Sequence, residues 1–275
     1  MGANGGMSPG DVILTGLRDF GARWKDLVTA VAVVVLPVSA VGLALVAALA
    51  PDAVGDLLSS TMTPEELEAS LASVSVEEWI RFGAAYAIFV VLSGIANIVA
   101  FGACLAIDGE HVRGNELSYG AGLREALRRW HSLLWLVILS GLLTLIGLVL
   151  CILPGIWLLI SWLAAPVVLM HEGLKGRRAM GRSYRLTRPR FWPVLLVGLL
   201  EFVGLGLIQS AATSLAGVAL PVSLEDVAES SFFAVMLLST LAGLVTMAIH
   251  TCVVTRLYLD LVARSETPVV AQVAT

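Results

Sequence analysis

Long apolar blocks constrain this chain more than any other feature of its sequence. A helix that crosses the hydrocarbon core of a bilayer needs about 20 mostly apolar residues, and several blocks here reach that length. Charged residues make up only 14% of the chain, against roughly 25% in an ordinary soluble domain. The mean hydropathy of +0.90 agrees. The sequence therefore predicts an all-α integral membrane protein.

Six segments are expected to span the membrane within one membrane domain, residues 1–275. The third and fourth form a tight hairpin, because Pro154 and Gly155 between them favour a turn. The fourth is short and contains Pro166, so it is either kinked or does not cross the full hydrocarbon core. The expected spans are residues 27–50, 82–107, 133–153, 156–170, 194–220 and 232–257. An interfacial amino-terminal helix is expected in residues 1–26. The six-helix bundle follows in residues 27–260, and a cytoplasmic tail in residues 261–275.

Positive charge is confined to alternate connecting segments. Except for Arg81, every Lys and Arg lies in the amino-terminal segment, in residues 108–132, in residues 171–193 or at the end of the last span. Because positive segments stay in the cytoplasm during insertion, both termini are expected to be cytoplasmic. The remaining segments, 51–78 and 221–230, are acidic and are expected to face outward. Their acids are Asp52, Asp56, Glu65, Glu66, Glu68, Glu77, Glu78, Glu225, Asp226 and Glu229.

An internal repeat precedes the hairpins. At a constant offset, the apolar positions of a first copy match those of a second, and each set lies on one helical face. A looser third copy runs over residues 179–192. We therefore expect three repeats of an amphipathic interfacial helix plus a transmembrane hairpin. The alternative is that these are ordinary cytoplasmic loops. The matched positions are Ile13, Leu17, Phe20 and Trp24 with Tyr119, Leu123, Ala126 and Trp130, and the third copy holds Met180 and Tyr184.

Several short motifs in the second half of the chain recur in a known family. They are Leu153-Pro154-Gly155-Ile156-Trp157, Pro166, Gly173, Ala179, Arg182-Ser183, Leu186-Thr187, Phe191-Trp192 and Leu257-Tyr258-Leu259-Asp260. In these motifs the chain resembles the membrane domain that is fused to some glycerophosphodiester phosphodiesterases and that also occurs alone in bacterial inner-membrane proteins. Val262 departs from the family, which usually has Arg there. The resemblance implies a six-helix domain in the bacterial cytoplasmic membrane. It does not imply phosphodiesterase activity, because in such fusions the activity lies in a separate soluble barrel and not in the membrane domain that this chain resembles.

Signatures of enzymes and cofactor sites are missing from the sequence. It has no P-loop, GxGxxG, HExxH, CxxC or GxSxG motif. His171 and Glu172 are expected to end a helix rather than bind a metal. Cys104, Cys151 and Cys252 are expected to be small buried residues. We therefore expect no enzymatic activity, no metal and no cofactor, and no motif indicates nucleic-acid binding.

Three polar residues lie inside expected spans and form a candidate site. Asn97, Glu201 and His250 lie roughly 9–15 Å from the cytoplasmic ends of their helices, at a rise of about 1.5 Å per residue. Similar depth would let them meet inside the bundle. An ionisable residue in hydrocarbon is costly and is a candidate functional residue. The cluster is either structural, joining helices by hydrogen bonds, or a substrate or proton site.

A dense basic segment before the fifth span is the second candidate site. Its cations are expected either to set topology alone or to bind the headgroups of anionic membrane lipids. They are Lys175, Arg177, Arg178, Arg182, Arg185, Arg188 and Arg190.

These two sites support functions of different classes. The function that we rank first rests on the basic segment: a non-enzymatic membrane domain that binds anionic lipid, a partner protein or a second copy of the chain, in support of membrane lipid metabolism. The alternative is a transporter of small solutes or lipids that uses Asn97, Glu201 and His250. An intramembrane enzyme ranks third, because no pair of nucleophile and base can be named.

Overall fold

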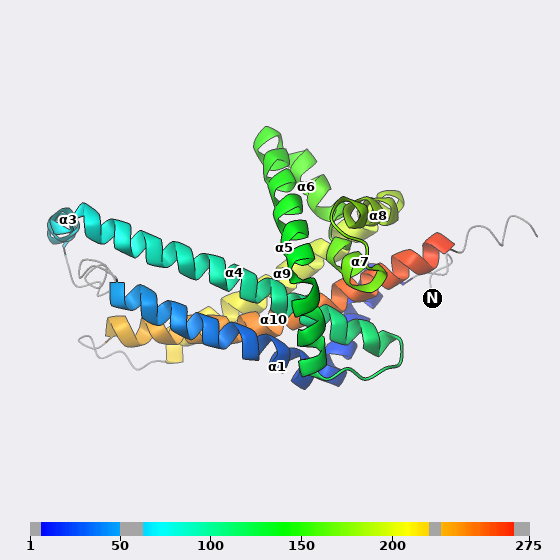
Figure 1. Ribbon diagram of the computed structural model, residues 1–275, viewed down its shortest axis with the longest axis horizontal. Coiled ribbons are helices and arrows are strands. Elements are labelled where there is room, and N and C mark those ends of the chain that lie inside the picture. Colours follow the sequence, from blue (N-terminus) through cyan, green and yellow to red (C-terminus); the bar gives the residue numbers. More distant parts are fainter. Residues whose placement is uncertain (1–6, 50–62, 220–226, 267–275) are drawn as a thin grey trace, which may run out of the picture. The chain divides into compact units, whose positions relative to one another are not determined.

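The computed structural model describes residues 7–49, 63–219 and 227–266, which fold almost entirely into helices (Figure 1). These residues contain no β-strand, and six of their helical segments are long and apolar enough to cross a membrane. The chain is therefore an all-α multi-pass membrane protein, which confirms the prediction from its apolar blocks. The helices are α1 (Pro9–Leu49), α3 (Pro64–Ser73), α4 (Val76–Val112), α5 (Tyr119–Leu150), α6 (Ile152–Ser161), α7 (Ala165–Glu172), α8 (Arg177–Thr187), the 3₁₀ helix η1 (Arg188–Arg190), α9 (Phe191–Ala219) and α10 (Val227–Glu266).

The chain divides into two compact units. Unit 1 comprises Met1–Val31, Ile98–Leu205 and Met247–Thr275. Unit 2 comprises Ala32–Asn97 and Gly206–Thr246. The long helices α1, α4, α9 and α10 each contribute residues to both units.

Unit 2 contains the described acidic segment that was expected to face outward. Thr63 and Glu66 form a capping box at the start of α3, in which each side chain bonds the other residue's backbone N–H. Further along the unit, the Nε2 amide of Gln209 in α9 donates to the carbonyl oxygen of Ser239 in α10 at 3.2 Å. Four acids of the two outer segments, Asp52, Asp56, Glu225 and Asp226, lie outside the described residues.

Large aliphatic side chains from α1, α4, α5 and α7 form the core of unit 1. Leu27, Leu105, Leu133 and Leu169 are almost completely buried. The α5–α6 hairpin packs most closely at Gly155, where a Cβ atom would lie 2.6 Å from the backbone nitrogen of Leu148. Glycine at this position therefore permits the tight hairpin that the sequence predicted.

The fourth span is broken in the middle, at Pro166. Because proline has no N–H, the carbonyl of Trp162 cannot bond four residues ahead, and it accepts instead from the N–H of Ala165 at 2.9 Å. This shift leaves the carbonyl oxygen of Ser161 free for side-chain donors. Ser183 Oγ donates to it at 2.8 Å, and Thr187 Oγ1 lies 3.2 Å from it. The predicted kink is therefore a full break, and hydroxyl groups of α8 satisfy the freed backbone group.

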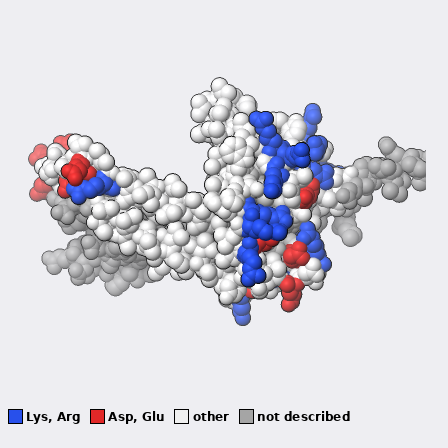
Figure 2. Space-filling model, viewed as in Figure 1, with Lys and Arg blue, Asp and Glu red and all other residues white. Residues whose placement is uncertain are grey.

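Apolar side chains cover much of the surface of unit 1. In the α5–α6 hairpin, Val149, Leu150 and Leu153 each expose more than three quarters of their area, and Phe202 in α9 does so too. The tip of this hairpin carries no charge (Figure 2). Soluble monomers rarely expose such continuous apolar surface, whereas lipid tails cover it in a membrane.

The three copies of the expected repeat differ in the structure. In α1, Arg23 has non-helical backbone angles (φ −134°, ψ 18°), so residues 9–22 are set apart from the apolar part. The third copy is the separate helix α8. The second copy is not a separate short helix, because residues 119–130 are the first part of the continuous α5. The three-repeat arrangement therefore stays a prediction.

Cysteine burial matches the sequence expectation at two of the three positions. Cys104 and Cys252 are buried. The expectation for Cys151 was wrong, because this residue is exposed at the turn between α5 and α6, where the hairpin leaves it without neighbours to cover it.

The charge distribution gives a testable topology. In a Cys151→Ser background, we expect Glu66→Cys to react with a membrane-impermeant maleimide in intact cells, because its segment is acidic and is predicted to face outward. Arg178→Cys should react only after the membrane is opened with detergent, which also serves as the control for its reactivity. Labelling of Arg178→Cys but not Glu66→Cys in intact cells would reverse the topology.

Candidate functional site

Glu201 and His250 form a hydrogen-bonded pair inside the apolar part of unit 1. Nδ1 of His250 in α10 lies 2.8 Å from Oε1 of Glu201 in α9. The carboxyl group is buried, with 7% of the Glu201 residue exposed. The imidazole ring stacks on Phe101 of α4, with ring centroids 5.7 Å apart and planes inclined by 22°. The predicted contact between Glu201 and His250 is thus present, and Phe101 holds the ring in place.

A proton must lie between these two groups, because neither a bare imidazole nitrogen nor a carboxylate can donate to the other. Of the protonation states that allow this hydrogen bond, two leave the pair electrically neutral, namely imidazolium with carboxylate and imidazole with carboxylic acid. Both forms avoid the cost of an uncompensated charge in hydrocarbon. The pair can therefore serve as a structural link between α9 and α10 or hold a transferable proton.

Asn97 has a different partner. Its Nδ2 amide donates to the carbonyl oxygen of Ser93 at 2.7 Å, one turn earlier in α4. Asn97 belongs to unit 2, whereas Glu201 and His250 belong to unit 1. A cluster of all three residues therefore stays a prediction.

The second candidate site is the short helix α8, which is amphipathic. One face packs into unit 1 through Ala179, Met180 and Leu186 together with Ser183 and Thr187. Most of the predicted basic residues are exposed on the other side. Figure 2 shows Lys and Arg side chains gathered over α8 and the start of α5. We call the exposed ones the α8 basic surface: Lys175, Arg177, Arg178, Arg185 and Arg188.

The two other predicted cations are partly buried. Nε of Arg182 lies 3.1 Å from Oε1 of Glu172 at the end of α7, and the Tyr258 hydroxyl donates to the same oxygen at 2.8 Å. Arg190 lines a small cavity with Asp260 and Arg264. Arg182 therefore holds the segment against α7 and α10, a role that the sequence did not distinguish from that of the exposed residues.

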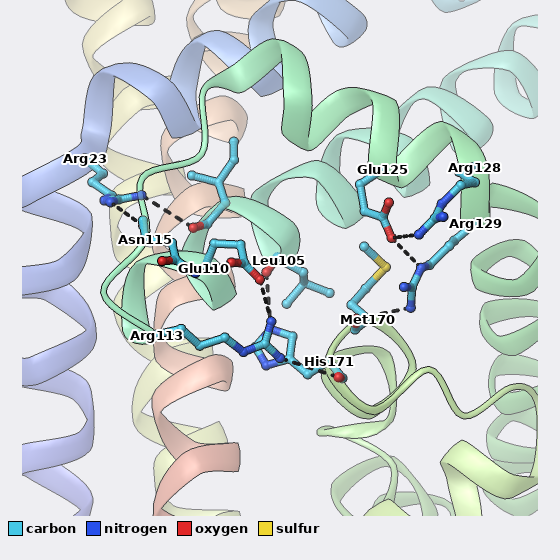
Figure 3. A network of polar contacts seen from close by, with 11 residues as sticks. Arg23, Leu105, Glu110, Arg113, Asn115, Glu125, Arg128, Arg129, Met170 and His171 are labelled. Atoms are coloured by element: carbon cyan, nitrogen blue, oxygen red, sulfur yellow. Dashed lines mark hydrogen bonds and ion pairs between the residues drawn. The ribbon is translucent and has the colours of Figure 1, made fainter.

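Arginines also bind the backbone at two helix ends in unit 1 (Figure 3). Arg23 donates to the carbonyl of Ile107 near the end of α4 at 3.5 Å. Arg129 donates to the carbonyls of Leu169 and Met170 near the end of α7, both at 3.2 Å. Leu169 and Met170 are among the last four residues of α7, whose carbonyls lack partners within the helix and carry partial negative charge, so the Arg129 guanidinium stabilises them.

His171 and Glu172, the adjacent pair at the end of α7, both contact other groups of the protein. Nε2 of His171 lies 3.3 Å from the carbonyl oxygen of Leu105, and Arg113 donates to the carbonyl of His171 at 3.5 Å (Figure 3). Glu172 is held by Arg182 and Tyr258, as described above. No group of residues in the described part of the chain has the composition and spacing to hold a metal ion.

A buried ion pair that sequence reasoning missed joins α1 to α10. Asp19, 7% exposed, accepts from the guanidinium of Arg256, whose Nη2 lies 2.8 Å from Oδ1. Asp108 of α4, only 1% exposed, lies beside Thr255 and Cys252 of α10. The available signal for Asp19 was its helical spacing from Val12 and Gly16, which are buried on the same face of the first part of α1.

Comparisons of this chain with protein-family models, with curated proteins and with solved structures find no match.

The Glu201–His250 contact predicts thermodynamic coupling. We expect Glu201→Gln and His250→Ala to be non-additive by about 1 kcal/mol in the free energy of unfolding, near the upper part of the range measured for polar contacts between membrane helices. Unfolding in mild detergent of both single variants and the double variant gives this coupling energy.

A matched control pairs Glu201→Gln with Ser140→Ala. Ser140 bonds only carbonyls of its own helix α5, so this pair should be additive. Additive losses for Glu201→Gln with His250→Ala as well would show that the two residues are not linked.

Proposed function

We propose that this chain is a non-enzymatic integral membrane domain that binds anionic lipid through the α8 basic surface. The observation that supports it is the arrangement of α8. Its apolar and hydroxyl face is packed into unit 1 while five cations remain exposed beside lipid-facing helices. If these cations only set the orientation of the chain in the membrane, they would have to lie in this segment but would not have to lie on a helix that is packed in one position.

Electrostatics makes such a surface suited to lipid headgroups. Each Lys or Arg near an anionic membrane surface contributes about 1 kcal/mol. Arginine also binds phosphate oxygens through two parallel hydrogen bonds, which lysine cannot do. Arg188 lies over the ring of Tyr184, 5.8 Å from its centroid, a cation–π contact that restricts the position of this guanidinium.

The proposal includes a location. Because the basic segments stay in the cytoplasm, α8 faces the cytoplasmic leaflet and both termini are cytoplasmic. The resemblance to the membrane domain of glycerophosphodiester phosphodiesterase fusions supports the bacterial cytoplasmic membrane and a role in membrane lipid metabolism.

A transporter is the second candidate function, and the Glu201–His250 pair favours it. A buried carboxyl group bonded to a histidine can hold a proton in hydrocarbon, and broken helices such as α6–α7 occur in transporters near substrate sites. A proton-coupled transporter requires Glu201 to titrate, so Glu201→Gln would abolish transport. A lipid-binding domain would bind the same lipid with this change.

Charge removal tests the proposed function. Replacement of Arg178, Arg185 and Arg188 by Gln should weaken binding of phosphatidylglycerol to the purified protein about fivefold per residue, because each loses about 1 kcal/mol. Binding is measured in mild detergent by the rise in thermal stability with lipid concentration, which follows from ligand linkage.

The same three positions changed to Lys provide the control, since charge is kept and binding should fall much less. Zwitterionic phosphatidylcholine should stabilise wild-type and variant proteins equally. Equal stabilisation of the Gln variant and wild type by phosphatidylglycerol would contradict binding at this surface.

A further inference from the structure

A pocket of about 340 Å³ whose lining includes three cationic side chains opens beside the start of α5 in unit 1. Arg128, Arg129 and Ser132 line it from α5, and Lys175 lines it from the turn before α8. Glu125 bonds both arginines, at 2.8 and 2.6 Å, so three cations face one carboxylate and the pocket is net positive. Arg129 is also fixed by the carbonyls at the end of α7. The pocket therefore has the charge and donors for a phosphate group, with one guanidinium already held in place.

An apolar groove of about 370 Å³ lies further along α5, between α5, α6 and α8. Its walls are aliphatic and aromatic side chains, and a single cation, Arg177, belongs to it. This composition suits a hydrocarbon chain. The residues on which the argument rests are Leu139, Leu143, Trp157, Leu158 and Tyr184.

The pocket and the groove lie along one face of α5. Positions 128, 132, 135, 139 and 143 follow one another at steps of four or three residues, which is helical spacing. Trp135, 59% exposed, lies between the two hollows. The turn before α8 passes close to it, because a Cβ atom on Gly176, whose φ is +50°, would lie 3.5 Å from Trp135 Cδ1. A polar site, an aromatic side chain and an apolar groove are thus arranged in that order.

We propose that one anionic phospholipid binds along this face of α5, with its phosphate in the Arg128–Arg129–Lys175 pocket and an acyl chain in the Leu139–Leu143 groove. This inference rests on the proposed function and names a defined site for the lipid. Arg177 reaches the same molecule from the side of α8.

The dimensions and direction fit a lipid of the cytoplasmic leaflet. From Ser132 to Leu143 the helix rises about 16 Å, close to half of the roughly 30 Å hydrocarbon core. In the expected topology α5 enters the membrane from the cytoplasm, so the pocket lies at headgroup level and the groove at acyl level. Tryptophan is enriched at the boundary between these levels, where Trp135 lies.

Two variants with different effects test the site. Arg128→Gln with Lys175→Gln should weaken binding of phosphatidylglycerol about 25-fold, at about fivefold per cation, whatever its chain length. Leu143→Trp should fill the groove and weaken binding of the dipalmitoyl lipid by roughly tenfold, because buried methylenes are lost. Binding of the dihexanoyl lipid to Leu143→Trp should stay unchanged. Titration of the purified full chain followed by native mass spectrometry measures each.

Matched controls use neighbouring residues that line neither hollow. Leu142→Trp places the same bulk on an exposed position of α5, and Arg18→Gln with Arg124→Gln removes two exposed cations. Both should bind like wild type, within about twofold, because neither touches the lipid.

The outcomes separate this inference from the proposed function. If wild type binds no phosphatidylglycerol, both are wrong. If binding depends on Arg178, Arg185 and Arg188 while the pocket and groove variants match their controls, the proposed function stands and this site is wrong. Equal effects of Leu143→Trp and Leu142→Trp on the dipalmitoyl lipid would also overturn it.

Discussion

Two hydroxyl groups of α8 compensate for the break in the fourth span, and the position of the basic surface depends on this contact. Backbone groups inside a membrane must find partners within the protein. Pro166 removes one helical hydrogen bond and thereby frees the carbonyl of Ser161, which Ser183 and Thr187 bind. Because both donors lie on the buried face of α8, the opposite face must present its arginines outward. A helix break required by one proline thus fixes the direction of the charges.

The charged residues of unit 1 divide into those that stabilise the fold and those left for a ligand. Arg23 binds a carbonyl near the end of α4, and Asp19 is paired with Arg256. Arg129 belongs to both groups, because it binds carbonyls at the end of α7 and also lines the pocket proposed for the phosphate. Burial of such a pair is favourable only with good geometry, and loss of one partner leaves an unpaired charge. The exposed cations of α8 and Lys175 have no such structural role in the described contacts, which makes them available for lipid.

Sequence reasoning reached the fold class because block length and charge segregation are local properties of the chain. It also predicted that Glu201 would bond His250 or Asn97, from the similar depth of these polar groups in their spans, and the structure has the contact with His250. It could not separate Arg182 from Arg185, because the partner of Arg182 is on another helix. It missed the pocket of Arg129 with Lys175 for the same reason. Rotation about a helix axis and contacts between distant helices are not encoded in spacing.

The central claim is that this chain holds anionic lipid on its cytoplasmic side, and the lipid that accompanies the purified protein tests it most directly. Wild-type protein would be extracted in mild detergent, and mass spectrometry would compare its bound lipids with a total extract of the same membranes. The account predicts that anionic phospholipids are enriched over zwitterionic ones relative to that extract. Bound lipids with the same headgroup composition as the total extract would contradict it.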